Sequence, residues 1–235
     1  MSEFLHPAYV IHQYPYRDSS AIVRFLTPEG GLVSAVAKGI KTARYNTKAG
    51  LLHPFTLLQI SLVGKGPLYT LRQIELVKVK DLKSAKALAL GLYLNELLLT
   101  FLAESEPNIP LFNAYERALL GIARGDYGTA LREFELSLLE SLGYGFLLDG
   151  DQDEQALEPD AYYLLELEKL PLKVQETSGE DVYAGSVLLA IAQRDWKCTG
   201  ARSAAKRLCK RAIQYYTGNK IFKSQLLWQQ YSDME

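Results

Sequence analysis

The feature that most constrains the fold is a change of pattern near residue 80. Before it, short runs rich in β-branched and aromatic residues alternate with turn signals, which is typical of β-strands. After it, leucine and alanine recur at helical spacing, beginning with residues 82–104. The pattern predicts an α+β chain with two domains, residues 1–80 and 81–235.

The first part contains five runs with the composition of strands. They cover residues 9–14, 21–26, 32–37, 55–63 and 69–79. A small closed antiparallel barrel buries five such strands without leaving long unpaired edges. The longer connection between the third and fourth runs fits a five-stranded OB-fold barrel, and an SH3-like barrel is the alternative with a similar pattern.

The second part has the pattern of a mainly α-helical domain. Helices are predicted over residues 82–104, 111–124, 129–142, 183–194, 200–216 and 223–231. Between the third and fourth helices the pattern predicts an acidic loop and a small hairpin of residues 162–167 with 170–175. This region, around 149–180, is predicted to be an irregular or hairpin insertion.

Charge is distributed unevenly along the chain, although the net charge is only −1. Residues 1–80 carry ten basic against four acidic side chains, and residues 191–235 carry nine against three. The middle block, 81–190, carries seven basic against twenty acidic side chains. Basic ends suggest a polyanionic partner.

Several classes of protein are disfavoured. The N-terminus lacks the basic start and apolar core of a secretory signal. The most apolar stretch, residues 87–103, carries Asn95 and Glu96 near its centre, which favours a buried helix over a membrane span. We therefore predict a cytoplasmic protein with no membrane contact. No phosphate loop, nucleophile elbow or metal-ligand spacing is present, so nothing indicates an enzyme.

The connection between the third and fourth predicted strands is strongly basic. Cations neutralise phosphates and release counterions, and a tyrosine can stack on a base. We predict that this loop contacts DNA through Lys38, Lys41, Arg44, Tyr45 and Lys48. Arg17, Arg24 and Arg72 would extend the patch, and the alternative is a solvated basic surface.

A second basic cluster lies on the predicted helix 200–216. On a helical wheel one half is cationic, and the other half holds apolar residues and Cys209, which is therefore predicted to be a packing residue. The cations are Arg202, Lys206, Arg207, Lys210 and Arg211. We predict that they bind nucleic acid or an acidic peptide, and a solvated face that offsets the acidic block is the alternative.

A third constellation lies on the predicted helix 129–142. Arg132 falls between Leu136 and Leu139 on a second side of this helix, away from its core stripe. An apolar pair beside one cation can receive an apolar residue that ends in a carboxylate. A helix packed on two sides gives the same pattern.

Sequence motifs in a fixed order span nearly the whole chain. They occupy residues 8–12, 18–20, 36–39, 52–56, 91–98, 131–136, 142–145, 204–207 and 222–225. The most specific combination is Gly-Leu-Tyr-x-Asn-Glu-Leu at 91–97, followed by Arg-x-Phe-Glu-x-x-Leu-Leu at 132–139 and Leu-Gly-Tyr at 142–144. In these motifs the chain resembles the RecO family of bacterial recombination mediators and DNA repair proteins.

The resemblance implies an N-terminal OB-fold, a helical domain, and a non-enzymatic protein of the bacterial cytoplasm and nucleoid. It implies binding to single- and double-stranded DNA, annealing of complementary strands, and partnership with RecR in loading RecA. It also implies recognition of the acidic, Phe-terminated tail of single-stranded DNA-binding protein. The residues that match this role are Arg132, with Leu136 and Leu139 as its apolar neighbours.

Some members of the family carry a four-cysteine zinc site after the Leu-Gly-Tyr motif. Residues 149–154 hold aspartate and glutamate instead, and the chain has only Cys198 and Cys209. We therefore predict no zinc and no other cofactor. Two further functions stay open: an adaptor that binds acidic protein tails without DNA contact, and a Mg²⁺-dependent nuclease whose carboxylates meet only in the fold.

Overall fold

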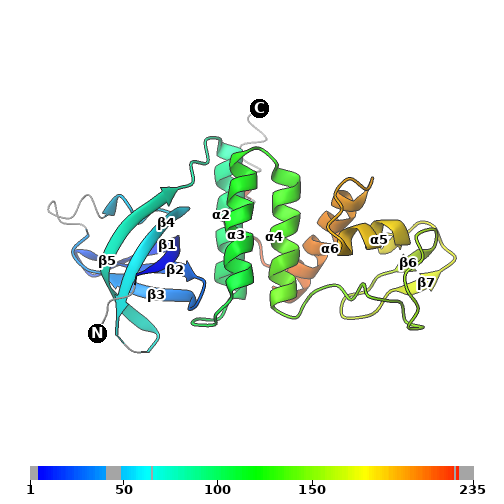
Figure 1. The fold of residues 1–235 in the computed structure, drawn as a ribbon, viewed down its shortest axis with the longest axis horizontal. Coiled ribbons are helices and arrows are strands. Elements are labelled where there is room, and N and C mark those ends of the chain that lie inside the picture. The colour runs from blue at the N-terminus through cyan, green and yellow to red at the C-terminus, as the bar shows by residue number, and fades with distance from the viewer. Residues whose placement is uncertain (1–4, 41–48, 65, 225, 228–235) are drawn as a thin grey trace. The chain divides into compact units, whose positions relative to one another are not determined.

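The computed structural model describes residues 5–40, 49–64, 66–224 and 226–227, and they form two compact units (Figure 1). The barrel unit comprises Met1–Tyr127 and Ile221–Glu235. The helical unit comprises Gly128–Lys220. The change from strands to helices predicted near residue 80 coincides with the end of the last barrel strand at Val79. As a domain boundary, residue 80 stays a prediction.

Five strands form a closed barrel. They are β1 (His6–Tyr16), β2 (Ser20–Thr27), β3 (Gly31–Ala37), β4 (Thr56–Val63) and β5 (Leu68–Val79). The order around the barrel is β1-β2-β3-β5-β4, and β1 pairs with β4 to close it. The start of β5 runs parallel to β3, with Leu68 opposite Ser34, whereas all other neighbours are antiparallel. The predicted α+β class and five-stranded OB-like barrel are confirmed.

The barrel core is made of apolar side chains from all five strands, among them the fully buried Val23, Phe25 and Ile60. β3 is buried at every residue, because the segment after the first long helix covers its outer side. There Ser105 donates its backbone N–H to the Leu32 carbonyl at 3.0 Å, and the Ser34 hydroxyl donates to Glu104 at 2.8 Å.

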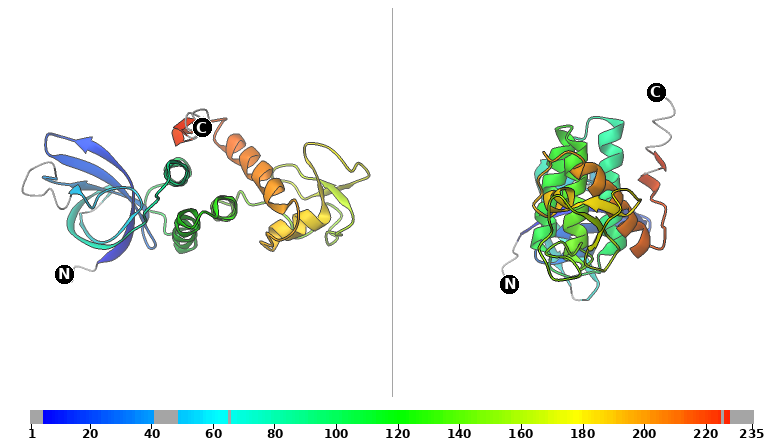
Figure 2. Two further views of the ribbon diagram at one scale, coloured as in Figure 1. Left: turned by 90° about the horizontal axis from the view of Figure 1, so that it is seen from above. Right: turned by 90° about the vertical axis from the view of Figure 1, so that its right-hand side faces the viewer.

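Two helices, α2 (Ala85–Phe101) and α3 (Ile109–Ala123), lie side by side against the barrel (Figure 2). The buried Asn95 joins them to β1: its side-chain amide donates to the Ile11 carbonyl at 2.8 Å and accepts from the Tyr115 hydroxyl at 2.6 Å. Asn95 is therefore a structural polar residue inside the predicted apolar helix. Among the described residues, no helix is long and apolar enough to cross a membrane.

The C-terminal segment returns to the barrel unit and docks on α2. Phe222 is buried and meets the Tyr93 ring edge-on at 5.6 Å. The Glu96 carboxylate accepts the backbone N–H groups of Lys223 and Ser224 at 3.1 and 2.9 Å. Most of the helix predicted over 223–231 falls outside the described residues.

The helical unit contains the three helices α4 (Tyr127–Ser141), α5 (Gly185–Ala192) and α6 (Ala201–Tyr216). A small sheet of order β7-β6-β8 accompanies them: β6 (Tyr162–Leu164), β7 (Leu172–Val174) and β8 (Val182–Ala184). The predicted hairpin is present as β6 and β7. The third strand, β8, was not predicted: residues 183 and 184 were assigned to the helix predicted over 183–194, which begins as α5 only at Gly185.

Candidate nucleic-acid interface

The basic loop of the barrel begins at Lys38, which is exposed and directly follows β3. The other predicted residues of this loop lie outside the described part of the chain: Lys41, Arg44, Tyr45 and Lys48. Their role in DNA contact therefore stays a prediction. Of the arginines expected to extend the patch, Arg24 lies 3.3 Å from a Glu104 carboxylate oxygen, so part of its charge is neutralised locally.

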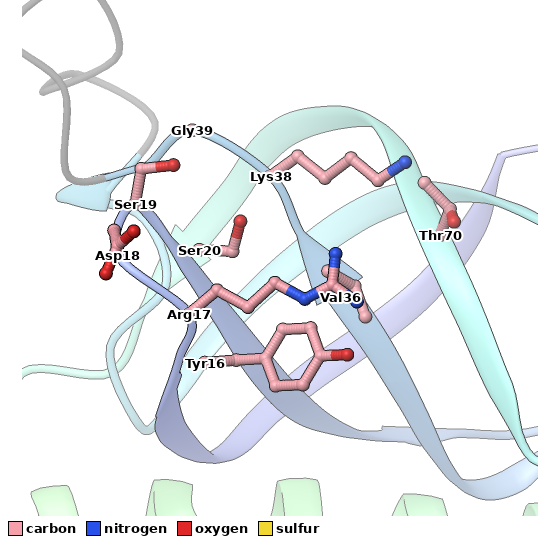
Figure 3. A pocket seen from close by; sticks show the side chains of 9 residues that line it. All are labelled: Tyr16, Arg17, Asp18, Ser19, Ser20, Val36, Lys38, Gly39 and Thr70. Atoms are coloured by element: carbon pink, nitrogen blue, oxygen red, sulfur yellow. The ribbon is translucent and has the colours of Figure 1, made fainter.

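A pocket of about 560 Å³ lies beside Lys38 (Figure 3). It brings together three places in the barrel: the turn between β1 and β2, the end of β3 and the start of β5. Its lining consists of Tyr16, Arg17, Asp18, Ser19, Ser20, Val36, Lys38, Gly39 and Thr70. The lining thus combines two cations, one carboxylate, three aliphatic hydroxyls and an aromatic ring.

Arg17 occupies this pocket in an unusual backbone conformation. Its φ of 51° lies in the left-handed region, which costs an L-residue other than glycine about 1–2 kcal/mol. Its guanidinium carbon lies 5.1 Å from the centre of the Tyr16 ring, a cation–π distance. The ring therefore holds the guanidinium within the pocket.

The basic face of α6 is present as predicted, and its cations fall into two groups. Arg202, Lys206 and Lys210 are exposed and follow one another at i, i+4 spacing, and none of them has an ion pair with another described residue. We call these three residues the α6 stripe. Eight residues of helix span about 12 Å, so the stripe is a row of positive charge along the helix.

The other two cations of α6 have partners within the helical unit. The Arg207 guanidinium lies 5.0 Å from the centre of the Tyr183 ring. Arg211 forms an ion pair with Asp181 and donates to the Leu165 carbonyl, and partial burial lowers the pKa of its guanidinium. Arg211 thus connects α6 to the neighbouring sheet region, and its contact with DNA stays a prediction.

The opposite side of α6 is core, and Cys209 is fully buried there, which confirms its predicted packing role. Burial raises the pKa of the Cys209 thiol, and the nearby Glu135 carboxylate raises it further. The thiol therefore stays protonated and unreactive. Within the described residues, no group of three or more His, Cys, Asp or Glu side chains is placed to hold a metal ion.

Arg132 on α4 is buried rather than open to solvent. Only 8% of the residue is exposed, and one guanidinium nitrogen lies 2.7 Å from Glu135 carboxylate oxygens. The predicted apolar neighbours Leu136 and Leu139 are 2% and 0% exposed. The three residues predicted to receive an acidic tail therefore form part of the interior, and Arg132 already has a carboxylate partner.

Comparison with known proteins gives the family. The model of the N-terminal part of recombination protein O matches residues 1–79, and the model of its C-terminal part matches residues 82–226. The chain belongs to the RecO family. It is 40% identical to the DNA repair protein RecO of Pseudomonas aeruginosa over 222 residues, covering 94% of this chain and 92% of that protein.

A second relative gives the same result. The DNA repair protein RecO of Dechloromonas aromatica is 33% identical over 233 residues, covering 97% of this chain and 96% of that protein. RecO membership supports a role in DNA repair and recombination, and the resemblance seen in the sequence motifs is confirmed.

Two features of this chain were not predicted from the sequence: the pocket beside Lys38 and the ion pair of Arg132 with Glu135. The pocket was missed because its lining comes from positions as far apart as Tyr16 and Thr70. The pairing of Arg132 with Glu135 was also missed, although their i, i+3 spacing on a helix was a usable signal.

Proposed function

We propose that this protein is a non-enzymatic recombination mediator that binds single- and double-stranded DNA and anneals complementary strands. With RecR, it helps to load RecA onto DNA coated by single-stranded DNA-binding protein, in the cytoplasm at the nucleoid. The α6 stripe is the single observation that supports this proposal best. Three exposed cations without acidic partners among the described residues are suited to phosphates, whose neutralisation drives sequence-independent binding.

A triple variant of the α6 stripe tests the proposal. Replacing Arg202, Lys206 and Lys210 with alanine should weaken duplex binding by a factor on the order of ten or more at low salt. The slope of log affinity against log salt should become shallower by about 0.9 for each phosphate that the variant no longer neutralises. Fluorescence anisotropy of a labelled duplex, measured at several salt concentrations, gives both quantities.

The matched control removes three other exposed cations of the helical unit: Lys169, Lys173 and Lys197. This variant has the same net charge as the triple variant of the α6 stripe. It should bind duplex DNA almost normally, because Lys169 and Lys173 already pair with Glu166 and Glu158. If the two variants lost duplex affinity equally, binding would depend on net charge alone and not on the α6 stripe. No binding by the parent protein would favour the alternative function, an adaptor for acidic tails.

We further propose that the helical unit docks the acidic tail of single-stranded DNA-binding protein at Arg132. The family match and the motif that contains Arg132, Leu136 and Leu139 support this proposal, because a Phe-terminated tail offers a carboxylate for the cation and an aromatic ring for the apolar neighbours. Glu135 is the present partner of Arg132. An incoming tail carboxylate must therefore replace Glu135, and docking requires local rearrangement of α4 and its neighbours.

A further inference from the structure

The pocket beside Lys38 has the chemistry of a nucleotide site. We propose that it binds one unpaired nucleotide of a DNA strand, with the phosphate between the guanidinium of Arg17 and the ammonium of Lys38. This inference rests on the proposed DNA-binding function and assigns that function a specific site in the barrel. It also gives the barrel a preference for single strands.

The arrangement of charge in the pocket favours an anion at one end. Figure 3 shows the long side chains of Arg17 and Lys38 extending in the same direction, toward Thr70 on β5. The Asp18 carboxylate points away from them, at the other end of the pocket. A phosphate near Thr70 would therefore meet two cations and a hydroxyl donor, while Asp18 is placed to accept a hydrogen bond from another part of the ligand.

The volume of the pocket indicates a ligand larger than a phosphate group alone. Pockets for small organic ligands span about 300–1,000 Å³, and this one, at about 560 Å³, falls inside that range. The hydroxyls of Ser19, Ser20 and Thr70 supply hydrogen-bonding groups around it, and Ser20 is buried, since only 8% of it is exposed. Polar groups that line an open pocket of this size are suited to a sugar and base attached to the phosphate.

Tyr16 and the backbone conformation of Arg17 position the Arg17 guanidinium before a ligand binds. Arg17 has a left-handed φ of 51°, a conformation that glycine adopts readily and other residues rarely adopt. Backbone strain of this kind concentrates at ligand sites. Tyr16 is a positioning residue, because its ring supports the guanidinium at 5.1 Å. The in-plane N–H groups of the guanidinium can then donate to a phosphate, and its other face can stack on a base.

The site should distinguish single strands from duplexes. A nucleotide in a duplex is stacked and paired, and it enters a pocket only after unstacking. A nucleotide of a single strand enters without that cost. The pocket therefore contributes to the binding of single-stranded DNA and little to the binding of duplex DNA.

The test compares Arg17→Gly with Arg124→Gly. Both variants remove one exposed positive charge from the barrel unit, and Arg124 ends α3, away from the pocket lining. Because glycine accepts a positive φ, Arg17→Gly should fold with an unfolding temperature no lower than that of the parent protein. Its affinity for a labelled oligothymidylate should fall at least about tenfold, the range expected for a charged hydrogen bond. Its affinity for a duplex of equal length should fall no more than that of Arg124→Gly.

A second variant separates positioning from charge. Tyr16→Leu keeps both cations but removes the ring beneath Arg17, so single-strand affinity should fall about two- to fivefold while the salt slope stays unchanged. The proposed site is wrong if Arg17→Gly and Arg124→Gly weaken single-strand binding equally, or if Arg17→Gly weakens single-strand and duplex binding equally. If the parent protein binds neither DNA at low salt, the proposed function fails together with the site.

Discussion

Replacing Arg132 with alanine is expected to destabilise the helical unit by about 3–5 kcal/mol. The reason is that the buried Glu135 carboxylate loses its ion-pair partner. Glu135 is only 2% exposed, and Arg132 is its ion-pair partner, at 2.7 Å. Removing one partner of a buried ion pair leaves an uncompensated charge in the interior, which is more costly than the pair itself was favourable. Chemical denaturation, followed by the fluorescence of the partly buried Trp196, measures the loss of stability.

The matched control is the double variant Arg132→Met with Glu135→Leu. It removes both charges and fills the space with apolar atoms, so most of the stability should return. If the single variant is as stable as the parent protein, or if the double variant is no more stable than the single one, the ion pair is not buried as described.

The same pair of variants makes the tail-docking proposal testable. Loss of tail binding in Arg132→Ala alone is ambiguous, because the helical unit is destabilised. The double variant should keep the fold and the binding of naked DNA, yet it should lose affinity for the acidic tail peptide because the cation is absent. Retained tail binding in a folded double variant would show that Arg132 does not receive the carboxylate.

Replacing Gly31 with alanine is expected to destabilise the barrel unit by roughly 3–5 kcal/mol, for two combined reasons. Gly31 has a φ of 59°, and a Cβ atom there would lie 1.9 Å from the carbonyl oxygen of Glu106. The obstacle is backbone, so β3 or the segment covering it must move. Because β3 leads directly into Lys38, that movement should also disturb the pocket.

The control for Gly31 is Gly125, which follows α3 with a φ of 85° but has no atom within 4 Å of an added Cβ. Gly125→Ala should therefore cost only about 1 kcal/mol, the contribution of the backbone conformation alone. Thermal or chemical denaturation of both variants separates steric overlap from backbone strain. Equal losses of stability would mean that the close approach of Glu106 is absent.

The barrel was predictable because each strand carries a local signal. The run 21–26 became β2, Ser20–Thr27, and the run 69–79 became β5, Leu68–Val79. The polar Asn95 in an otherwise apolar helix correctly indicated a buried helix rather than a membrane span, and its partners on β1 and α3 explain why it is there. The sequence signals for these features come from residues close together in the chain, whereas the partners of Asn95 were known only from the fold.

The remaining features depend on residues that only the fold brings together. The pocket needs the β1–β2 turn, the end of β3 and the start of β5 to converge, and no spacing rule encodes that. The wheel for α6 grouped five cations correctly, but it could not show that Asp181 pairs with Arg211. For α4, the wheel placed Arg132 between two leucines and left its exposure undetermined, because burial is decided by neighbouring elements.

Strand annealing tests the central claim most directly. Complementary oligonucleotides would be coated with single-stranded DNA-binding protein, either full-length or lacking its acidic tail, and the rate of duplex formation would be measured with and without this protein. A recombination mediator that uses both DNA contact and tail docking should accelerate annealing, and the acceleration should require the tail. No acceleration, together with no binding of naked DNA at low salt, would contradict the account.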